Sequence, residues 1–134
     1  MAKLASIEGI GQKYGEKLEK AGVTTIEALL KIGSTRAGRK EIASKSDLNE
    51  NQILNWVNRA DLFRVKGIGS QYADLLENAG VDSIPELAQR NPEHLLMQLQ
   101  EVNDTKHLVR SMPYLKQVRK WVGQAKNLPK IVNH

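Results

Sequence analysis

Apolar residues recur along this chain at intervals of three and four, the spacing that places side chains on one face of an α-helix. Stripes of this kind occupy residues 14–21, 53–60, 72–79 and 118–125. No segment alternates between apolar and polar residues as a half-exposed β-strand does. The pattern therefore predicts an all-α protein.

Residue types that favour helix ends indicate where several of these helices end and begin. Gly22 and Gly80 follow the first and third stripes, where a left-handed C-terminal position favours a residue without Cβ. The next helices are expected to begin at Thr24 and Ser83, since each is followed three residues later by a glutamate, as in a capping box. Asn91, which precedes a proline, marks a further helix start.

The sequence repeats itself. Residues 7–29 match residues 65–87 at 11 of 23 positions, and residues 52–60 return as residues 117–125. The first offset is 58 and the second 65, so the second copy holds seven extra residues, equivalent to about two helical turns. No low-complexity linker separates the copies, so we expect them to pack as one compact unit. The expected boundaries are 5–62 for the first repeat, 63–128 for the second and 129–134 for a C-terminal tail.

Each copy carries a Gly-Ile-Gly turn directly before a predicted helix. The first turn is residues 9–11 and the second turn is residues 67–69. Two glycines leave backbone N–H groups uncovered where a helix begins, and the positive end of the helix dipole lies at the same place. A phosphate can dock there without any side chain. The central isoleucines are expected to point into the core.

These turns carry a resemblance to a known motif. Each is followed by a small residue, Gly15 or Ala73, and then by a leucine, Leu18 or Leu76. This pattern resembles the helix-hairpin-helix motif of DNA repair nucleases, polymerases, ligases and Holliday-junction proteins. Residues 18–30 also resemble the related C-terminal domain of the bacterial RNA polymerase alpha subunit.

Over nearly its whole length the chain resembles an uncharacterised bacterial family of tandem helix-hairpin-helix proteins, known as a domain of unknown function. The resemblance to this family is strongest in residues 7–26, 52–62, 65–84 and 86–92. In better-known helix-hairpin-helix proteins, hairpins come in pairs about half as far apart as these two. The resemblance therefore implies one good and one degenerate hairpin in each repeat. Residues 45–49 and 110–113, which lack the two glycines, are the candidates for the degenerate ones.

The charges are distributed unevenly. The chain has 20 basic and 15 acidic residues, for a net charge of +5. Residues 105–134 hold seven basic residues and no acidic one, whereas residues 65–104 hold two basic and seven acidic residues. A basic patch permits nucleic-acid binding and does not require it, because it can equally be a solvated helix face. The same alternative applies to a second cluster, formed by Arg36, Arg39 and Lys40.

The candidate DNA-binding residues lie around both turns and on the last predicted helix. They are Gly9, Ile10, Gly11, Gln12, Lys13 and Lys17 for the first turn, Gly67, Ile68, Gly69, Ser70 and Gln71 for the second, and Lys116, Arg119 and Lys120 on the helix.

The first turn is the better candidate, because two lysines follow it, whereas Asp74 follows the second. The alternative hypothesis, in which the second turn is purely structural and binds no phosphate, stays open. DNA-binding relatives often carry proline before the first glycine, but here Glu8 and Lys66 stand there, and Glu8 disfavours a bound phosphate.

The aromatic residues are expected to be structural. Tyr14, Tyr72, Trp56 and Trp121 could stack on bases, as aromatics do in single-strand binders. All four lie on apolar helical stripes, however, which favours a place in the core.

Composition excludes several classes of chemistry. The chain has no cysteine, which excludes disulfides, thiol catalysis and thiolate zinc sites. Its histidines, His94, His107 and His134, lack the spacing of a metal or catalytic site, so we expect no enzyme activity, no metal and no cofactor. No apolar run approaches the ~18 residues of a membrane span, and no signal-peptide core is present, so a cytoplasmic protein without membrane contact is expected.

Two functions remain. The first is a non-enzymatic module that binds DNA without sequence preference, through backbone amides of the turns and flanking basic residues, across the minor groove as the resemblance implies. The second is a protein-interaction or scaffold module with an unidentified protein partner, in which the hairpins are purely structural. The acidic stretch at residues 65–104 and Glu8 favour the second.

Overall fold

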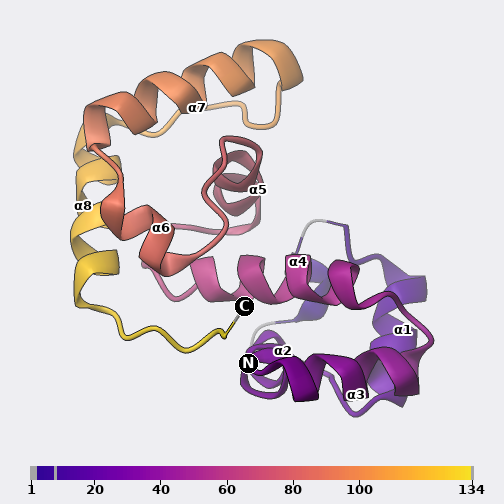
Figure 1. The fold of residues 1–134 in the computed structure, drawn as a ribbon. Helices are drawn as coiled ribbons and strands as arrows, with labels where there is room; N and C mark the ends of the chain where they lie inside the picture. The colour runs from indigo at the N-terminus through magenta and orange to yellow at the C-terminus, as the bar shows by residue number, and fades with distance from the viewer. Residues whose placement is uncertain (1–2, 8, 134) are drawn as a thin grey trace. The chain divides into compact units, whose positions relative to one another are not determined.

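A computed structural model describes residues 3–7 and 9–133 of the chain. These residues form one 3₁₀ turn and eight α-helices, and their only β-type pairing is an isolated bridge between Lys3 and Thr25 (Figure 1). The all-α prediction is therefore confirmed. The elements are η1 (Leu4–Ser6), α1 (Gln12–Lys20), α2 (Ile26–Gly33), α3 (Arg36–Ser46), α4 (Glu50–Leu62), α5 (Ser70–Asn78), α6 (Ile84–Gln89), α7 (Pro92–Lys106) and α8 (Leu115–Asn127).

The chain divides into two compact units. Unit 1 comprises Met1–Asp61 together with Ile131–His134, and unit 2 comprises Leu62–Lys130. Within unit 1, α3 packs against both α1 and α2, and η1 lies against α1. Within unit 2, α8 packs against α6 and α7, and α5 packs against α7 (Figure 1). Each unit thus buries the apolar stripes of its own helices.

The extra residues of the second copy lie in both a helix and a connection. Helix α7 has 15 residues where α3 has 11, an addition of about one turn. The connection after α7 runs over residues 107–114, whereas the connection after α3 runs over residues 47–49. Helix α6, with 6 residues, is in turn shorter than α2, with 8. The additional length therefore extends mainly the region between α6 and α8.

Glycines end α1 and α5, as the sequence predicts. Gly22 has φ of +83° and Gly80 has φ of +92°, the left-handed conformation that a residue without Cβ adopts readily. The N–H of Val23 donates to the carbonyl of Leu18 at 2.9 Å, and the N–H of Val81 donates in the same way to Leu76. These hydrogen bonds satisfy carbonyls that a helix end would otherwise leave without a partner.

The helices that follow begin at capping side chains. Ser83 Oγ accepts a hydrogen bond from the Glu86 N–H at 3.3 Å, which confirms the predicted start of α6. Helix α2 begins one residue later than predicted, because Thr25 and not Thr24 is the cap and accepts from the Ala28 N–H at 3.0 Å. Asn91 caps α7 by accepting from the His94 N–H at 3.0 Å, as predicted.

Both tryptophans are core residues. Trp56 is 4% exposed and Trp121 is 2% exposed, which confirms their predicted burial. Trp56 pairs with Tyr14 at a ring-centroid distance of 5.4 Å, and Trp121 pairs with Tyr72 at 5.2 Å. Tilted rings at such distances are a favourable aromatic geometry. The two tyrosines are half-buried, so their rings form the edge of the core.

A charged side chain lies inside unit 1. Arg39 is 4% exposed, and its guanidinium donates to the carbonyl of Gly33 at 2.8 Å and to that of Asn133 at 2.6 Å. Burial lowers the pKa of Arg39, Arg36 lowers it further, and Glu50 opposes this. Arg39 therefore does not belong to an exposed phosphate-binding cluster. It instead links α3 to the end of α2 and to the C-terminal segment within unit 1.

Replacing Trp121 with alanine should lower the free energy of unfolding by about 3–5 kcal/mol, because the substitution leaves a cavity and removes the partner of Tyr72. Urea unfolding followed by far-UV circular dichroism measures this loss. Tyr114→Ala is the control: Tyr114 is 78% exposed, so its loss should cost less than about 0.5 kcal/mol. An unchanged midpoint for Trp121→Ala would contradict the structural role of the indole.

Candidate nucleic-acid interface

The two Gly-Ile-Gly turns have nearly the same backbone conformation. Gly9 and Gly67 have φ of +93° and +97°. Gly11 and Gly69 are extended, with φ of −89° and −101°, and each immediately precedes a helix. In the middle of each turn the isoleucine N–H donates to a carbonyl three residues back, at 3.1 Å for Ile10 and 3.2 Å for Ile68. The sequence match between the copies thus corresponds to matching local geometry.

The isoleucines point into the core as expected, since Ile10 is 3% exposed and Ile68 is 4% exposed. Only their backbone is available to a ligand. Gly11 and Gly69, in contrast, are exposed.

The helices after the turns begin without a capping side chain. Glycine caps both α1 and α5, whereas Thr25, Thr35, Ser83 and Asn91 cap α2, α3, α6 and α7 with their side chains. Within the described residues, the N–H groups of Gln12, Lys13, Ser70 and Gln71 donate to no acceptor. These N–H groups and the positive ends of the helix dipoles are available to an anion.

The surroundings of the first turn carry charges of both signs. Lys13 is exposed and Lys17 is half-buried. Gln12 donates to Glu16 Oε1 at 3.2 Å. A shallow pocket of about 410 Å³ beside the turn is lined by Gln12 and Lys3, and also by the carboxylates of Glu16 and Glu19. Glu8, expected to disfavour a phosphate here, lies outside the described residues.

The second turn borders two pockets. One, of about 350 Å³, is lined by Gly67, Gly69, Ser70, Gln71 and Tyr72, none of which is charged. Ser70 is half-buried and Gln71 is exposed. The other pocket, of about 370 Å³, is lined by Lys66, Gly67, Gln117, Lys120, Trp121 and Gln124. The second turn thus has cationic side chains beside it, contributed from before the turn and from α8.

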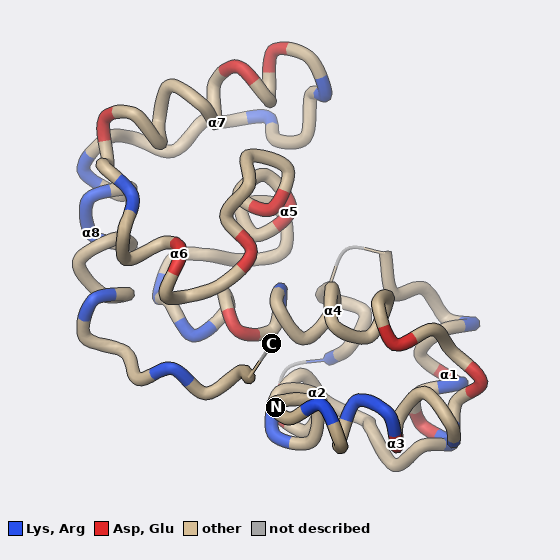
Figure 2. The backbone as a smooth tube through the Cα atoms, viewed as in Figure 1, with Lys and Arg blue, Asp and Glu red and all other residues tan. Residues whose placement is uncertain are grey.

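The three candidate cations of α8 differ in their contacts. Figure 2 shows the basic residues along this helix. Lys116 and Lys120 are exposed and form no ion pair with any described residue. Arg119 instead pairs with Glu93, with 2.7 Å between its Nη2 and the carboxylate Oε1. The hydrogen bond from Arg119 lowers the pKa of Glu93. A phosphate would therefore compete with Glu93 for Arg119, but not for the lysines.

Residues 8–128 match the sequence family described as Domain of unknown function (DUF4332). The chain belongs to this family. The match spans both turns and all the α-helices of the described residues. No curated protein and no solved structure was found to match the chain. The expected membership of a domain-of-unknown-function family is confirmed.

The two segments proposed as degenerate hairpins lie in helix connections of this DUF4332 chain. Residues 45–49 span the end of α3 and the link to α4, where Asp47 has φ of +60° and Asn49 Oδ1 accepts from the Asn51 N–H at 2.7 Å. Residues 110–113 lie between α7 and α8. The carbonyl of Ser111 accepts a hydrogen bond from the Tyr72 hydroxyl at 3.0 Å, which ties this connection to α5.

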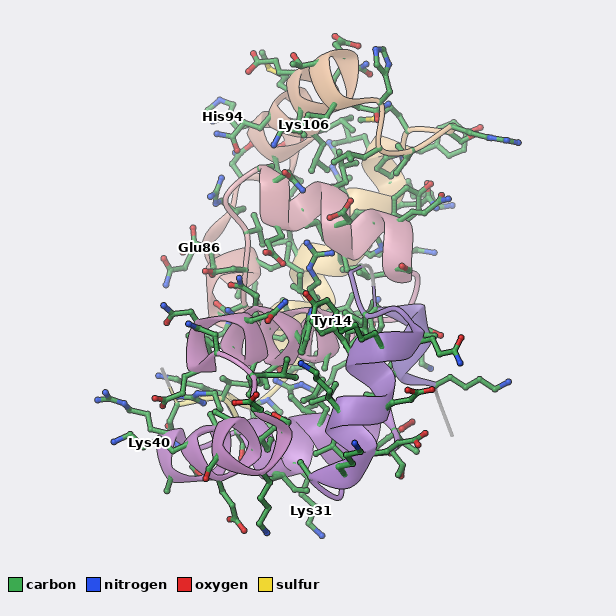
Figure 3. The ribbon with its side chains drawn as sticks, turned by 90° about the vertical axis from the view of Figure 1, so that its right-hand side faces the viewer. Tyr14, Lys31, Lys40, Glu86, His94 and Lys106 are labelled. Carbon is green, nitrogen blue, oxygen red and sulfur yellow. The ribbon has the colours of Figure 1, made fainter. Side chains whose placement is uncertain are left out.

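The histidines and two further lysines of the DUF4332 chain lie on its surface or outside the described residues. Figure 3 shows Lys31 and Lys40 extending away from unit 1, and His94 on the outside of α7. His107 is exposed after the end of α7, and His134 lies outside the described residues. Among the residues that the structure describes, no group of three or more His, Cys, Asp or Glu could hold a metal ion. No described helix is both long and apolar enough to span a bilayer.

The sequence analysis did not predict the pocket formed by Lys66 and Lys120, because it considered Lys66 with the second turn and Lys120 with the last helix. The alignment of the two copies does show that both positions gain positive charge. Lys66 stands where the first copy has Glu8, and Lys120 stands where it has Asn55. Both differences add positive charge to the second copy, but only the fold brings the two positions to one pocket.

Replacing Gly67 with alanine should destabilise unit 2 by at least about 1 kcal/mol, because a left-handed φ is costly for a residue with Cβ. The new Cβ would also lie 3.0 Å from Trp121 Nε1. Gly69→Ala is the matched control, since Gly69 has φ of −101° and no atom within 4 Å of a Cβ built on it. Urea midpoints of the two variants measure the difference, and equal midpoints would show that Gly67 is not constrained.

Proposed function

We propose that this chain is a non-enzymatic, cytoplasmic tandem helix-hairpin-helix module that binds DNA without sequence preference. Backbone amides at the two Gly-Ile-Gly turns contact phosphates, and flanking basic residues add attraction. The observation that supports this most directly is that α1 and α5 both begin at a glycine, which has no side chain to cap the helix. Such a helix start leaves N–H groups for an anion.

The expected selectivity follows from the donors involved. Amide N–H groups and lysine ammonium groups contact phosphate oxygens, which carry no base identity. The side chains of Ile10 and Ile68 are buried and do not reach a base. Tyr14 and Tyr72 pair with tryptophans instead of standing free as stacking platforms. These features favour binding to the backbone of duplex DNA.

The helix-hairpin-helix interpretation is supported by the elements around the turns. The first turn connects η1 to α1, and the second connects the end of α4 to α5. Both turns place an isoleucine in the core between the flanking elements. The helix before the first turn is a single 3₁₀ turn, so the second hairpin is the more complete one.

A scaffold function is the second candidate. It is favoured by the carboxylates of Glu16 and Glu19, which line the pocket beside the first turn and would repel a phosphate. In this case the turns serve only to pack each unit, and the ligand is a protein. A DNA titration separates the two functions.

Fluorescence polarisation with labelled duplex, junction and single-stranded DNA should show duplex binding with a dissociation constant of about 10⁻⁴ to 10⁻⁶ M at physiological salt. If the module contacts about three to five phosphates, the slope of log affinity against log salt should lie near −3 to −4.5. Absence of binding to every form of DNA at low salt would contradict the proposal and leave the scaffold function.

Lys13→Gln should weaken duplex binding and reduce the salt slope by about 1, because one phosphate contact is lost. Lys20→Gln is the matched control: it removes the same charge from the same helix, about 10 Å farther along the axis. Equal effects of the two substitutions would mean that the overall charge, and not the first turn, determines the affinity.

A further inference from the structure

The pocket formed by Lys66, Gly67, Gln117, Lys120, Trp121 and Gln124 is distinct from the start of α5. It contains two lysines and no acidic residue. Both lysines are exposed, and neither forms an ion pair with any residue that the structure describes. The pocket therefore presents positive charge that no described carboxylate neutralises.

The Trp121 side chain lines the same pocket. The residue as a whole is 2% exposed, and its indole Nε1–H donates to no acceptor in the described part of the chain. Nε1 is not among the fully buried polar atoms that lack a partner, so this N–H is accessible to a ligand that enters the pocket. Indole N–H and ammonium groups are donors only, so a ligand of this pocket should be rich in acceptors.

The pocket is held in place by hydrogen bonds. Gln124 Oε1 accepts from the Lys66 N–H at 2.9 Å, and Gln124 Nε2 donates to the Lys66 carbonyl at 3.2 Å. These two hydrogen bonds fix the Lys66 backbone against α8, the helix that carries Lys120. Gln117 Oε1 accepts from the Tyr114 N–H at 2.7 Å, so another lining side chain is also anchored. The site is therefore preorganised apart from the lysine side chains.

The equivalent positions of unit 1 do not carry this combination. In the aligned sequence Asn55 replaces Lys120, Arg59 replaces Gln124, and Glu8 replaces Lys66. The tryptophan is retained, and Trp56 Nε1 lies 3.8 Å from a Cβ built on Gly9. Unit 1 therefore offers a similar indole without the pair of lysines, which makes it an internal comparison.

From these observations we infer that the Lys66–Lys120 pocket binds a phosphate group. The two ammonium groups donate charge-assisted hydrogen bonds to its oxygens, and the Trp121 indole N–H donates a third. The inference rests on the proposed function for its biological source, which is a phosphate of the DNA backbone. The contact lies beside the second turn and adds to the backbone amides of α5. A free phosphate has the same chemistry, so the experiment tests both sources.

The test follows the indole N–H signals by ¹H–¹⁵N correlation spectroscopy. The chain has two tryptophans, so a Trp56→Phe variant assigns both signals. Sodium phosphate is titrated into the full chain and compared with sodium chloride at equal ionic strength. The Trp121 signal should shift in a saturable way with phosphate, and the Trp56 signal should not. A second titration uses the duplex DNA.

Lys66→Gln/Lys120→Gln should abolish the phosphate response and lower duplex affinity about tenfold, with a salt slope reduced by about 1 to 2. Lys126→Gln/Lys130→Gln is the matched control, because it removes two exposed lysines from the same unit outside the pocket. The control should keep the phosphate response and lose at most about threefold in affinity. Both variants should retain the circular dichroism spectrum of the parent.

Each outcome is decisive. Responses of Trp121 to both phosphate and DNA, lost in the pocket variant alone, support the inference. A response to phosphate without DNA binding supports the pocket and overturns the proposed function. DNA binding without a Trp121 response to either titrant, or with equal losses in the two double variants, overturns the pocket and leaves the proposed function in place. No response and no DNA binding overturn both.

Discussion

The contact between a tryptophan ring and the first glycine of a turn is the interaction on which each unit depends. In unit 2 a Cβ on Gly67 would lie 3.0 Å from Trp121 Nε1, and the Trp121 ring packs at 5.2 Å from that of Tyr72. The indole therefore holds the turn from one side and α5 from the other. Since Gly67 also has φ of +97°, packing and backbone conformation both require glycine there. Fixing the turn determines where α5 begins, and hence where its uncapped N–H groups lie.

At the glycine and the tryptophan, one substitution affects both the stability of the fold and the binding of a ligand. At the exposed lysines, a substitution affects binding alone. A substitution at Gly67 disturbs the packing of Trp121 and the position of the amides together, so lost binding in such a variant has two explanations. Lys13, Lys66 and Lys120 are exposed, and their side chains can be shortened with little effect on the core. Charge-removing variants therefore report on the ligand, whereas glycine and tryptophan variants report on the fold.

Local patterns in the sequence were enough to predict the all-α class and several local features of the fold. Gly22 and Gly80 end helices, Trp56 and Trp121 are buried, and Ile10 and Ile68 face the core, because periodicity and backbone preference act over a few residues. The buried position of Arg39 was not predictable, since it depends on the carbonyl of Asn133, 94 residues away. The Lys66–Lys120 pocket was missed for the same reason: its members are neighbours only after α8 folds back on the second turn.

Net charge along the sequence is a poor guide to the electrostatics of unit 2. Residues 65–104 carry two basic and seven acidic residues, which favours a scaffold function when only composition is considered. In the structure, however, two of these carboxylates are paired: Glu86 with Arg90 at 3.0 Å and Glu93 with Arg119 at 2.7 Å. Neither lines the pockets beside the second turn. Since exposed charges more than about 8 Å apart are largely screened at physiological salt, the lining residues and the nearby Asp74 of α5 weigh most on a bound phosphate. At the second turn the lining residues are neutral or cationic, so an acidic segment can still contain a phosphate-binding site.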